Sequence, residues 1–205
     1  MGTPAVGNVL KTGAALWYAP SGETKPDETS VAFGAAWGGN WARVGYTKEP
    51  VKLKYESTEY DIEVQEELAA VDRKRTKEAA TIETVLAEFT AAYLRLVGGD
   101  QDSVTTTAAG SGQKGYEYTG LGGVATIGKH AWGFEGEFVD SAGVSQPVRF
   151  FIHIGTAMIN GDLEFSQKTD DYVGMPVQIK ALTDTTQAAG EKLVLMQRVT
   201  AAATT

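Results

Sequence analysis

The last third of the chain is a series of short runs in which hydrophobic and polar side chains alternate. Alternation with a period of two places successive side chains on opposite faces of a sheet, which is typical of β-strands. Asn160-Gly161 stands between two of the runs and favours a type I′ hairpin turn, because both central residues of that turn have positive φ. The pattern predicts a mainly β fold. The expected strands cover residues 9–18, 124–127, 131–139, 148–154, 163–168, 177–182 and 192–199.

The clearest strand pair is predicted between residues 51 and 64. If Tyr55 faces Tyr60, one register places apolar side chains on one face and opposite charges on the other. The resulting cross-strand pairs are Leu53 with Ile62, Val51 with Val64, Lys54 with Asp61 and Lys52 with Glu63. Each charged pair contributes only about 0.2–1 kcal/mol. We therefore expect the apolar face to supply most of the stability and the charges to specify the register.

One helix is predicted near residue 90. Thr90 can act as its N-cap, and Gly98-Gly99 ends it. The apolar stripe between these two signals consists of Tyr93, Leu94 and Val97. Upstream, residues 76–88 fit both a helical and a strand period. We favour a strand there, partly on the family resemblance given below.

Composition favours one folded domain over residues 1–205. The chain is 42% hydrophobic and contains 24 glycines, which suits a core joined by many turns and long loops. We expect an N-terminal arm at 1–8, long loops at 19–50 and 98–123, and a short tail at 200–205. The N-terminus lacks the pattern of a secretory signal, and no apolar run is long enough to span a membrane.

Charge and cysteine usage argue against several classes of function. The net charge is −8, so the basic surface of a nucleic-acid-binding protein is missing, and an acidic chain repels phosphate. The chain has no cysteine, which excludes disulfides and thiolate metal sites and fits a reducing cytoplasm.

No residue pattern for catalysis, metal binding or cofactor binding stands out. Residues 123–130 resemble a phosphate-binding loop, but His130 occupies the position that requires Ser or Thr. His130 and His153 are expected to be structural, and the pair Glu135 and Glu137 is expected to be solvated. Gly-x-Ser-x-Gly and His-Glu-x-x-His sequences are missing. We therefore expect a protein that is not an enzyme.

The aromatic residues of the 19–50 loop suggest a contact surface. Trp37, Trp41 and Tyr46 lie in a stretch with few charges, and aromatic side chains are enriched at protein interfaces. We predict that these three residues are interface aromatics. The alternative is a sugar-binding face formed by Trp37, Trp41 and Trp132.

A boundary in charge follows the predicted strand pair. The acidic residues Glu66 and Glu67 are followed by a basic group that consists of Arg73, Lys74, Arg75 and Lys77. The two groups are either solvated loop faces or complementary patches on stacked copies of the chain.

The order of these features resembles a known family. The strand pair at 51–64 is followed by residues 77–99, where Phe-Thr-x-x-Tyr-Leu precedes a glycine pair. The C-terminal half contains Ala-Met-Ile-Asn-Gly-x-Leu-Glu-Phe and, from Met175, the run Met-Pro-Val-Gln-Ile-Lys-Ala-Leu-Thr-Asp. In these features, over roughly residues 45–200, the chain resembles the major tail protein, or tail tube protein, of long-tailed bacteriophages.

The resemblance implies an architecture and a set of partners. The subunit would be a β-sandwich-like or barrel-like domain with one flanking helix, six copies would form a ring with a continuous inner β-barrel, and rings would stack into a hollow tube for DNA ejection. The implied partners are the tape measure protein, the tail terminator, the distal tail or baseplate proteins and the DNA that passes through the lumen without specific binding. The protein would be made and assembled in the host cytoplasm, belong to the virion tail and contact no membrane. We favour a non-contractile tail.

Two groups of residues are candidates for roles in such a tube. We expect the face with Asp61 and Glu63, together with Lys52 and Lys54, to look into the lumen. Contacts between rings are expected between two sets of residues, Glu66 and Glu67 on one side and Arg73, Lys74, Arg75 and Lys77 on the other. The alternatives are a secretion-system tube ring, a tail terminator, a capsid decoration protein or a carbohydrate-binding module.

Overall fold

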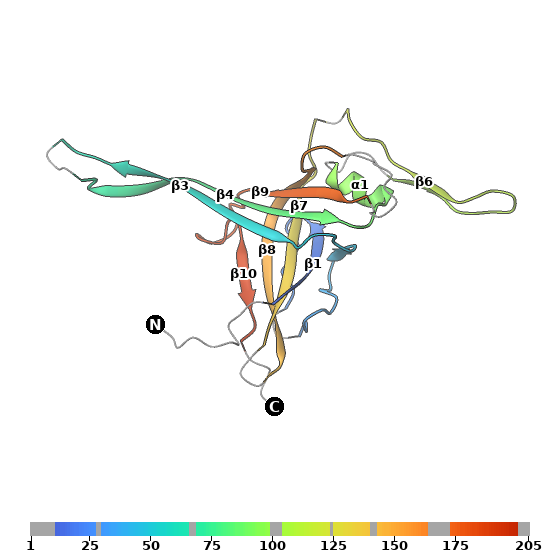
Figure 1. Cartoon of the computed structure of the whole chain (residues 1–205), viewed down its shortest axis with the longest axis horizontal. Helices are drawn as coiled ribbons and strands as arrows, with labels where there is room; N and C mark the ends of the chain where they lie inside the picture. Colours follow the sequence, from blue (N-terminus) through green and yellow to red (C-terminus); the bar gives the residue numbers. More distant parts are fainter. Residues whose placement is uncertain are drawn as a thin grey trace.

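The structure is a computed structural model, and it describes residues 11–27, 30–65, 69–98, 104–123, 125–139, 143–163 and 173–200. These residues form ten strands and one helix (Figure 1). The strands are β1 (Lys11–Pro20), β2 (Ala42–Val44), β3 (Lys52–Ile62), β4 (Asp72–Leu86), β5 (Thr105–Thr107), β6 (Tyr116–Tyr118), β7 (His130–Val139), β8 (Ser145–Ile159), β9 (Met175–Ala181) and β10 (Leu195–Arg198). The helix is α1 (Ala91–Val97). The prediction of a mainly β subunit with one helix is confirmed for the described residues.

Eight strands form one antiparallel sheet in the order β2-β1-β7-β8-β9-β4-β3, with β10 also paired to β8. The long strand β8 is the centre of this sheet, because one of its edges pairs first with β10, at residues 148–151, and then with β9, at residues 155–159. The sheet is thereby divided into a lower half-sheet (β2, β1, β7, β10 and the first part of β8) and an upper half-sheet (the last part of β8, β9, β4 and β3). In Figure 1, β8 and β10 run vertically and β3, β4 and β9 run horizontally.

The main core packs the inner faces of both half-sheets and the helix together. The lower half-sheet contributes Leu16, Trp132 and Ile152, and the upper one contributes Ile82 and Ile179, all of them buried. Burial of such side chains contributes about 1.5–3 kcal/mol each. Leu96 and Val97 of α1 join the same cluster.

A second, smaller core lies on the outer face of the lower half-sheet. Its residues are sequence neighbours of the main core residues, as the strand period requires, so Trp17 follows Leu16 and Phe151 precedes Ile152. Trp37 and Trp41, from the segment after β1, cover this face. The segment therefore packs on its own subunit.

The helix forms where the sequence predicts it. The Thr90 side chain accepts a hydrogen bond from the Tyr93 backbone N–H at 3.2 Å, and the Gly98 N–H donates to the Leu94 carbonyl. Both caps satisfy backbone groups that a helix end leaves unpaired. The strand preference for residues 76–88 is also confirmed, since β4 covers most of that range.

The predicted strand pair at 51–64 is wrong. Residues 52–62 form the single strand β3, which pairs with β4, so Tyr55 lies opposite Ala80 and Tyr60 opposite Lys74. The predicted turn would fall at Glu56-Ser-Thr-Glu59, which contains no Gly, Pro, Asn or Asp to favour a turn conformation. Matching of charges across the pair is therefore not sufficient to place a turn.

Three other segments differ from the sequence-based expectation, namely 125–127, 19–50 and 98–123. Residues 125–127 are described and are not a strand. Gly161 has φ +85°, as an Asn-Gly turn requires. The expected strand 163–168 lies outside the described residues from 164 onward and stays a prediction. The segments 19–50 and 98–123 contain short strands, β2 in the first and the hairpin β5–β6 in the second.

Candidate functional site

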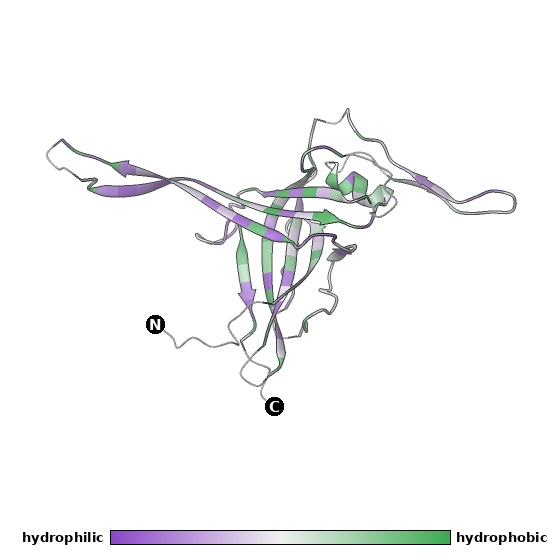
Figure 2. Ribbon diagram, viewed as in Figure 1, coloured by the Kyte–Doolittle hydropathy of each residue, from purple (hydrophilic) through white to green (hydrophobic). Residues whose placement is uncertain are grey.

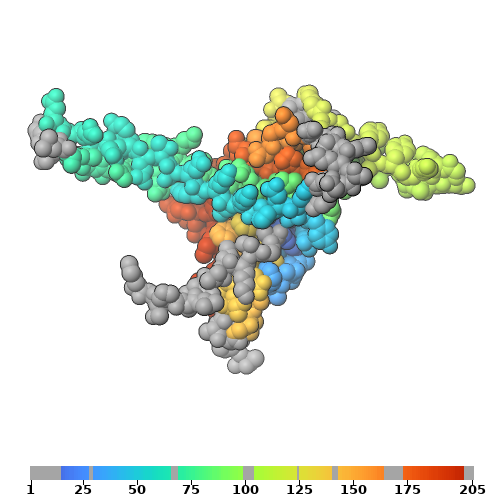
Figure 3. All heavy atoms as spheres, in the orientation of Figure 1, coloured from blue at the N-terminus to red at the C-terminus, as the bar shows by residue number. Residues whose placement is uncertain are grey.

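The hairpin β3–β4 extends well beyond the body of the subunit (Figure 3). From Ala80 to Leu86, every second residue of β4 is buried, whereas residues 72–78 are all exposed. On β3, residues 54–61 are exposed as well. Figure 2 shows hydrophilic residues along most of this projection. We call residues 54–62 and 72–79 the arm. A two-stranded ribbon exposed on both faces is marginally stable on its own, so the arm is a surface suited to contact with another molecule.

Ion pairs across the arm join its two strands. Arg73 Nε lies 2.6 Å from Asp61 Oδ1, and its Nη1 lies 3.3 Å from Glu59 Oε2. Arg75 pairs with Glu78, whose carboxylate also accepts a hydrogen bond from the Tyr55 hydroxyl at 2.7 Å. These hydrogen bonds, first from Tyr55 and then from Arg75, hold the pKa of Glu78 below its usual value. Exposed pairs of this kind contribute little to stability, because solvent screens them.

The predicted inter-ring residues are only partly described. Glu66 and Glu67 lie outside the described residues. Arg73 and Arg75 are exposed but paired within their own arm, whereas Lys74 and Lys77 form no ion pair with any residue that the structure describes. The inter-ring contact itself stays a prediction.

The predicted lumen-facing residues do not share one face as expected. Lys54 pairs with Glu83 of β4 at 2.6 Å, and Lys52 lies 3.8 Å from Glu49. Asp61 is an odd number of residues from Lys54 along one continuous strand, so the strand period turns it to the opposite face. Glu63 follows the end of β3 and is exposed. Which face looks into a lumen stays a prediction.

The upper half-sheet has a hydrophilic outer face. In register, Lys54 is followed across the strands by Thr81, Lys180 and Thr156. In the neighbouring row, Glu83 receives the Lys54 ion pair and a hydrogen bond from the Gln178 amide at 3.1 Å. These contacts hold the pKa of Glu83 below its usual value. This face carries both signs of charge. It is therefore not the uniformly acidic surface that would repel DNA phosphates.

Two of the three predicted interface aromatics are buried inside the subunit. Trp37 is 3% exposed and Trp41 is 9% exposed, and Trp37 stacks on Trp17 with ring centroids 5.1 Å apart. Their burial is thus explained without a partner, and only Tyr46, at 68% exposure, is available for a contact. Trp132 is also buried. The three tryptophans of the sugar-binding alternative therefore form no exposed platform.

A buried ion pair in the lower half-sheet was missed by the sequence reasoning. Glu135 and Arg149 are buried, with Arg149 Nε 3.3 Å from Glu135 Oε2, so the expectation of a solvated Glu135 is wrong. The second carboxylate oxygen accepts from the Gly34 N–H at 2.8 Å, and Arg149 donates to the Val31 and Ala32 carbonyls. The pair thus fastens the segment around residues 31–34 to the sheet. An arginine within the apolar run 148–154 was the available signal.

The two histidines lie apart from any metal-binding cluster. The His130 ring makes edge contacts with Tyr18 and Trp132. Burial lowers the pKa of His153, and the nearby Asp184 and Glu191 partly oppose that shift. Within the described ranges, no three His, Asp or Glu side chains are grouped as metal ligands would be. Within the same ranges, no helix is long and apolar enough to cross a membrane.

Comparison with known proteins supplies one match. A family described as "Phage tail tube protein" matches residues 3–203, which is nearly the whole chain. A comparison with curated proteins finds no match.

Proposed function

This chain belongs to the family of phage tail tube proteins, and from that premise we propose that six copies form a ring and that the rings stack into the hollow tube of a long-tailed phage. Membership makes the protein a structural component of the virion tail that associates with itself. The family match over residues 3–203 is the observation that carries this proposal. Ring number, inner barrel and DNA passage are the proposed details.

Free strand edges support a ring with a continuous inner β-barrel. Among the described residues, β3 pairs only with β4, so its other edge offers unpaired backbone N–H and C=O groups. Such edges invite pairing with another chain, and closure of a sheet into a barrel removes them. We infer that the upper half-sheet of each copy joins that of the next copy around the ring.

The hydrophilic outer face of the upper half-sheet suits the wall of the lumen. Its rows of polar and charged side chains would keep the bore wet, and the presence of both signs would limit tight binding of DNA phosphates. Lys52 and Lys54 lie on this face at the base of the arm, whereas Asp61 and Glu63 lie further out. The tape measure protein would occupy this lumen before DNA is ejected through it.

Contacts between rings are proposed for the arm. Arg73, Lys74, Arg75 and Lys77 of one copy would meet Glu66 and Glu67 of a copy in the next ring. Such a head-to-tail contact does not close on itself and lets the tube grow. The tube would end at the tail terminator and at the distal tail or baseplate proteins, and assembly would take place in the host cytoplasm. We propose a non-contractile tail and no catalytic step.

Negative-stain electron microscopy of the purified protein, first dilute and then concentrated, tests this function. We expect rings with a central hole that stack into tubes of uniform width as the concentration rises. The experiment is repeated with distal tail proteins added as an initiator, so that slow nucleation is not mistaken for an inability to assemble. A protein that stays monomeric at all concentrations with the initiator present would overturn the proposal.

A further inference from the structure

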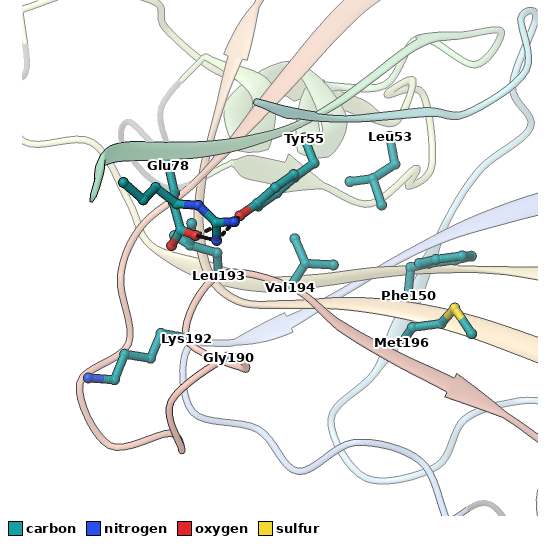
Figure 4. A pocket seen from close by; sticks show the side chains of 10 residues that line it. Leu53, Tyr55, Glu78, Phe150, Gly190, Lys192, Leu193, Val194 and Met196 are labelled. Atoms are coloured by element: carbon teal, nitrogen blue, oxygen red, sulfur yellow. Dashed lines mark hydrogen bonds and ion pairs between the residues drawn. The ribbon is translucent and has the colours of Figure 1, made fainter. Parts of the chain in front are cut away.

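An apolar groove opens beneath the base of the arm, at the gap between β3 and β10 (Figure 4). It has a volume of about 330 Å³. Its floor consists of Leu53, Phe150, Val194 and Met196, and Met196 is 55% exposed. The main core of the subunit therefore reaches the surface here.

Polar groups surround the mouth of this groove. Tyr55, Glu78 and Arg75 form a hydrogen-bonded cluster on the arm side, and the exposed Lys192 lies on the opposite side. An apolar floor with a polar rim is the usual anatomy of a protein interface. The rim offers donors and acceptors to the hydroxyl groups of an incoming side chain.

The hairpin β5–β6 projects from the other side of the molecule (Figure 1) and lacks the charges of the arm. Between residues 104 and 118 the only side chains that are charged at neutral pH are Glu117 and Lys114. Glu117 accepts a hydrogen bond from the Ala91 N–H at the start of α1, at 3.2 Å, which ties the hairpin to the body. Exposed strand edges are normally protected by charges, so the edges of this nearly neutral hairpin are suited to being covered.

Two tyrosines give this hairpin an apolar surface. Tyr116 is 52% exposed and Tyr118 is 59% exposed, and their rings stack with centroids 6.4 Å apart. Residues two apart on a strand lie on the same face, so the two rings form one continuous patch. Tyrosine is among the residues that contribute most to binding energy at interfaces.

We propose that Tyr116 and Tyr118 of one copy dock into the groove of a neighbouring copy, with the aromatic rings on the Leu53–Met196 floor and the hydroxyl groups at the polar rim. This inference rests on the proposed function, since membership in a tube-forming family makes a second copy the expected occupant. The patch and the groove belong to different ends of the molecule, so the contact is heterologous and repeats from copy to copy.

Site-directed crosslinking tests the contact, because the chain has no cysteine of its own. The full-length variant with Tyr118→Cys and Met196→Cys is treated with a short bifunctional thiol reagent during assembly. We expect a ladder of covalent multimers on a denaturing gel. The controls are the two variants that carry only one of these cysteines. Each control forms at most a covalent dimer, because a copy with a single thiol can be linked to only one other copy.

A second measurement uses the paired substitution Tyr116→Ser and Tyr118→Ser. Loss of both rings is expected to raise the concentration needed for half-maximal assembly by about tenfold or more, while far-ultraviolet circular dichroism stays that of a folded subunit. Lys114→Ser, on the same hairpin, is the matched control and leaves assembly unchanged.

The outcomes separate this contact from the tube itself. Tubes that form without any ladder, together with an unchanged assembly concentration in the tyrosine variant, would overturn the contact and leave the proposed function standing. A ladder in a protein that never forms tubes would support the contact and overturn the proposed function. A folded protein that forms neither a ladder nor tubes overturns both.

Discussion

At the scale of the residue, the buried pair Glu135–Arg149 does more than join two strands. Arg149 also donates to Gln197 on β10, and its guanidinium lies 5.9 Å from the Trp37 ring. The same two side chains therefore hold β7, β8, β10 and the covering segment together. A buried charge that loses its partner is strongly destabilising, so this contact can be tested directly.

Arg149→Met should destabilise the subunit by about 3–5 kcal/mol, because it leaves the Glu135 carboxylate buried without a countercharge. Urea denaturation measures the change. The matched control is Arg43→Met, which removes an exposed arginine that lies over the Tyr46 ring and should change stability by less than about 1 kcal/mol. The double variant Glu135→Leu and Arg149→Met should recover part of the loss. If Arg149→Met and Arg43→Met lowered the free energy of unfolding equally, the buried pair would contribute no more to stability than an exposed arginine does.

His153 should make stability depend on pH below neutrality. Burial lowers its pKa in the folded state from the usual 6.5, so the unfolded chain binds the proton more readily. Stability is then complete above about pH 6.5 and falls as the pH drops from 6.5 toward the lower folded pKa. The negative charges of Asp184 and Glu191 oppose this lowering of the pKa, and the positive charge of Lys25 adds to it.

Thermal unfolding between pH 8 and about pH 3 measures this effect, and the comparison is with the His153→Asn variant. The substituted protein should lose the part of the pH dependence that lies just below pH 6.5. Below about pH 4 a second decline is expected in both proteins, because hydrogen bonds from Thr186 and Gln187 hold the pKa of Asp184 below its usual value. Parallel curves for the two proteins above pH 5 would contradict the role assigned to His153.

At the scale of the element, the arm combines internal ion pairs with a proposed role between rings. Arg73 lies directly opposite Asp61 across the two strands, so its charge stabilises the arm whether or not another copy is present. The two roles can be separated by two kinds of variant. One reverses the charge of the arginines, and the other exchanges Arg73 with Asp61 so that the ion pair within the arm is kept.

Arg73→Glu combined with Arg75→Glu should stop tube growth while the body stays folded. Like charges across strands cost only about 0.2–1 kcal/mol each, which is small against the stability of the core. The exchange variant Arg73→Asp with Asp61→Arg keeps the pair within the arm but moves the positive charge. If only the contact between rings matters, the exchange variant also fails to grow, as seen by electron microscopy. Normal tubes from the double Glu variant would rule the contact out.

Local signals explain which elements could be predicted from the sequence. The helix was predictable because Thr90 and Gly98 act within one turn of the residues they cap. The strands β7, β8 and β9 were predictable because each alternates in its own sequence. The β3–β4 pairing was not, since Tyr55 and Ala80 are 25 residues apart and a nearer register satisfied the same charges.

Candidate sites depend on contacts that alternation does not encode. Trp37 and Trp41 gave the sequence signal of an interface, and they are instead the cover of the second core. The groove requires β3 and β10 to lie near each other, and these strands are far apart in the chain and do not pair. Burial of Glu135 likewise follows from the position of the segment around Gly34. In each case the position of a distant segment decides whether a side chain is exposed.

At the scale of the whole molecule, we propose that copies of the subunit complete one another's sheets. Among the described residues, β2 and β3 each pair with only one strand, and two hairpins project from the body in opposite directions (Figure 1). Membership in the tail tube family supplies the reason, because a tube subunit must present different surfaces to its neighbours. We propose that the charged arm and the nearly neutral β5–β6 hairpin are such surfaces.

The branching of the sheet at β8 also bears on how the sequence can vary. Both half-sheets are built on this one strand, with β10 paired to residues 148–151 and β9 paired to residues 155–159. A change of length at residues 152–154 would therefore displace the part of β8 that pairs with β9 relative to the part that pairs with β10, so we expect the length of this stretch to tolerate little variation.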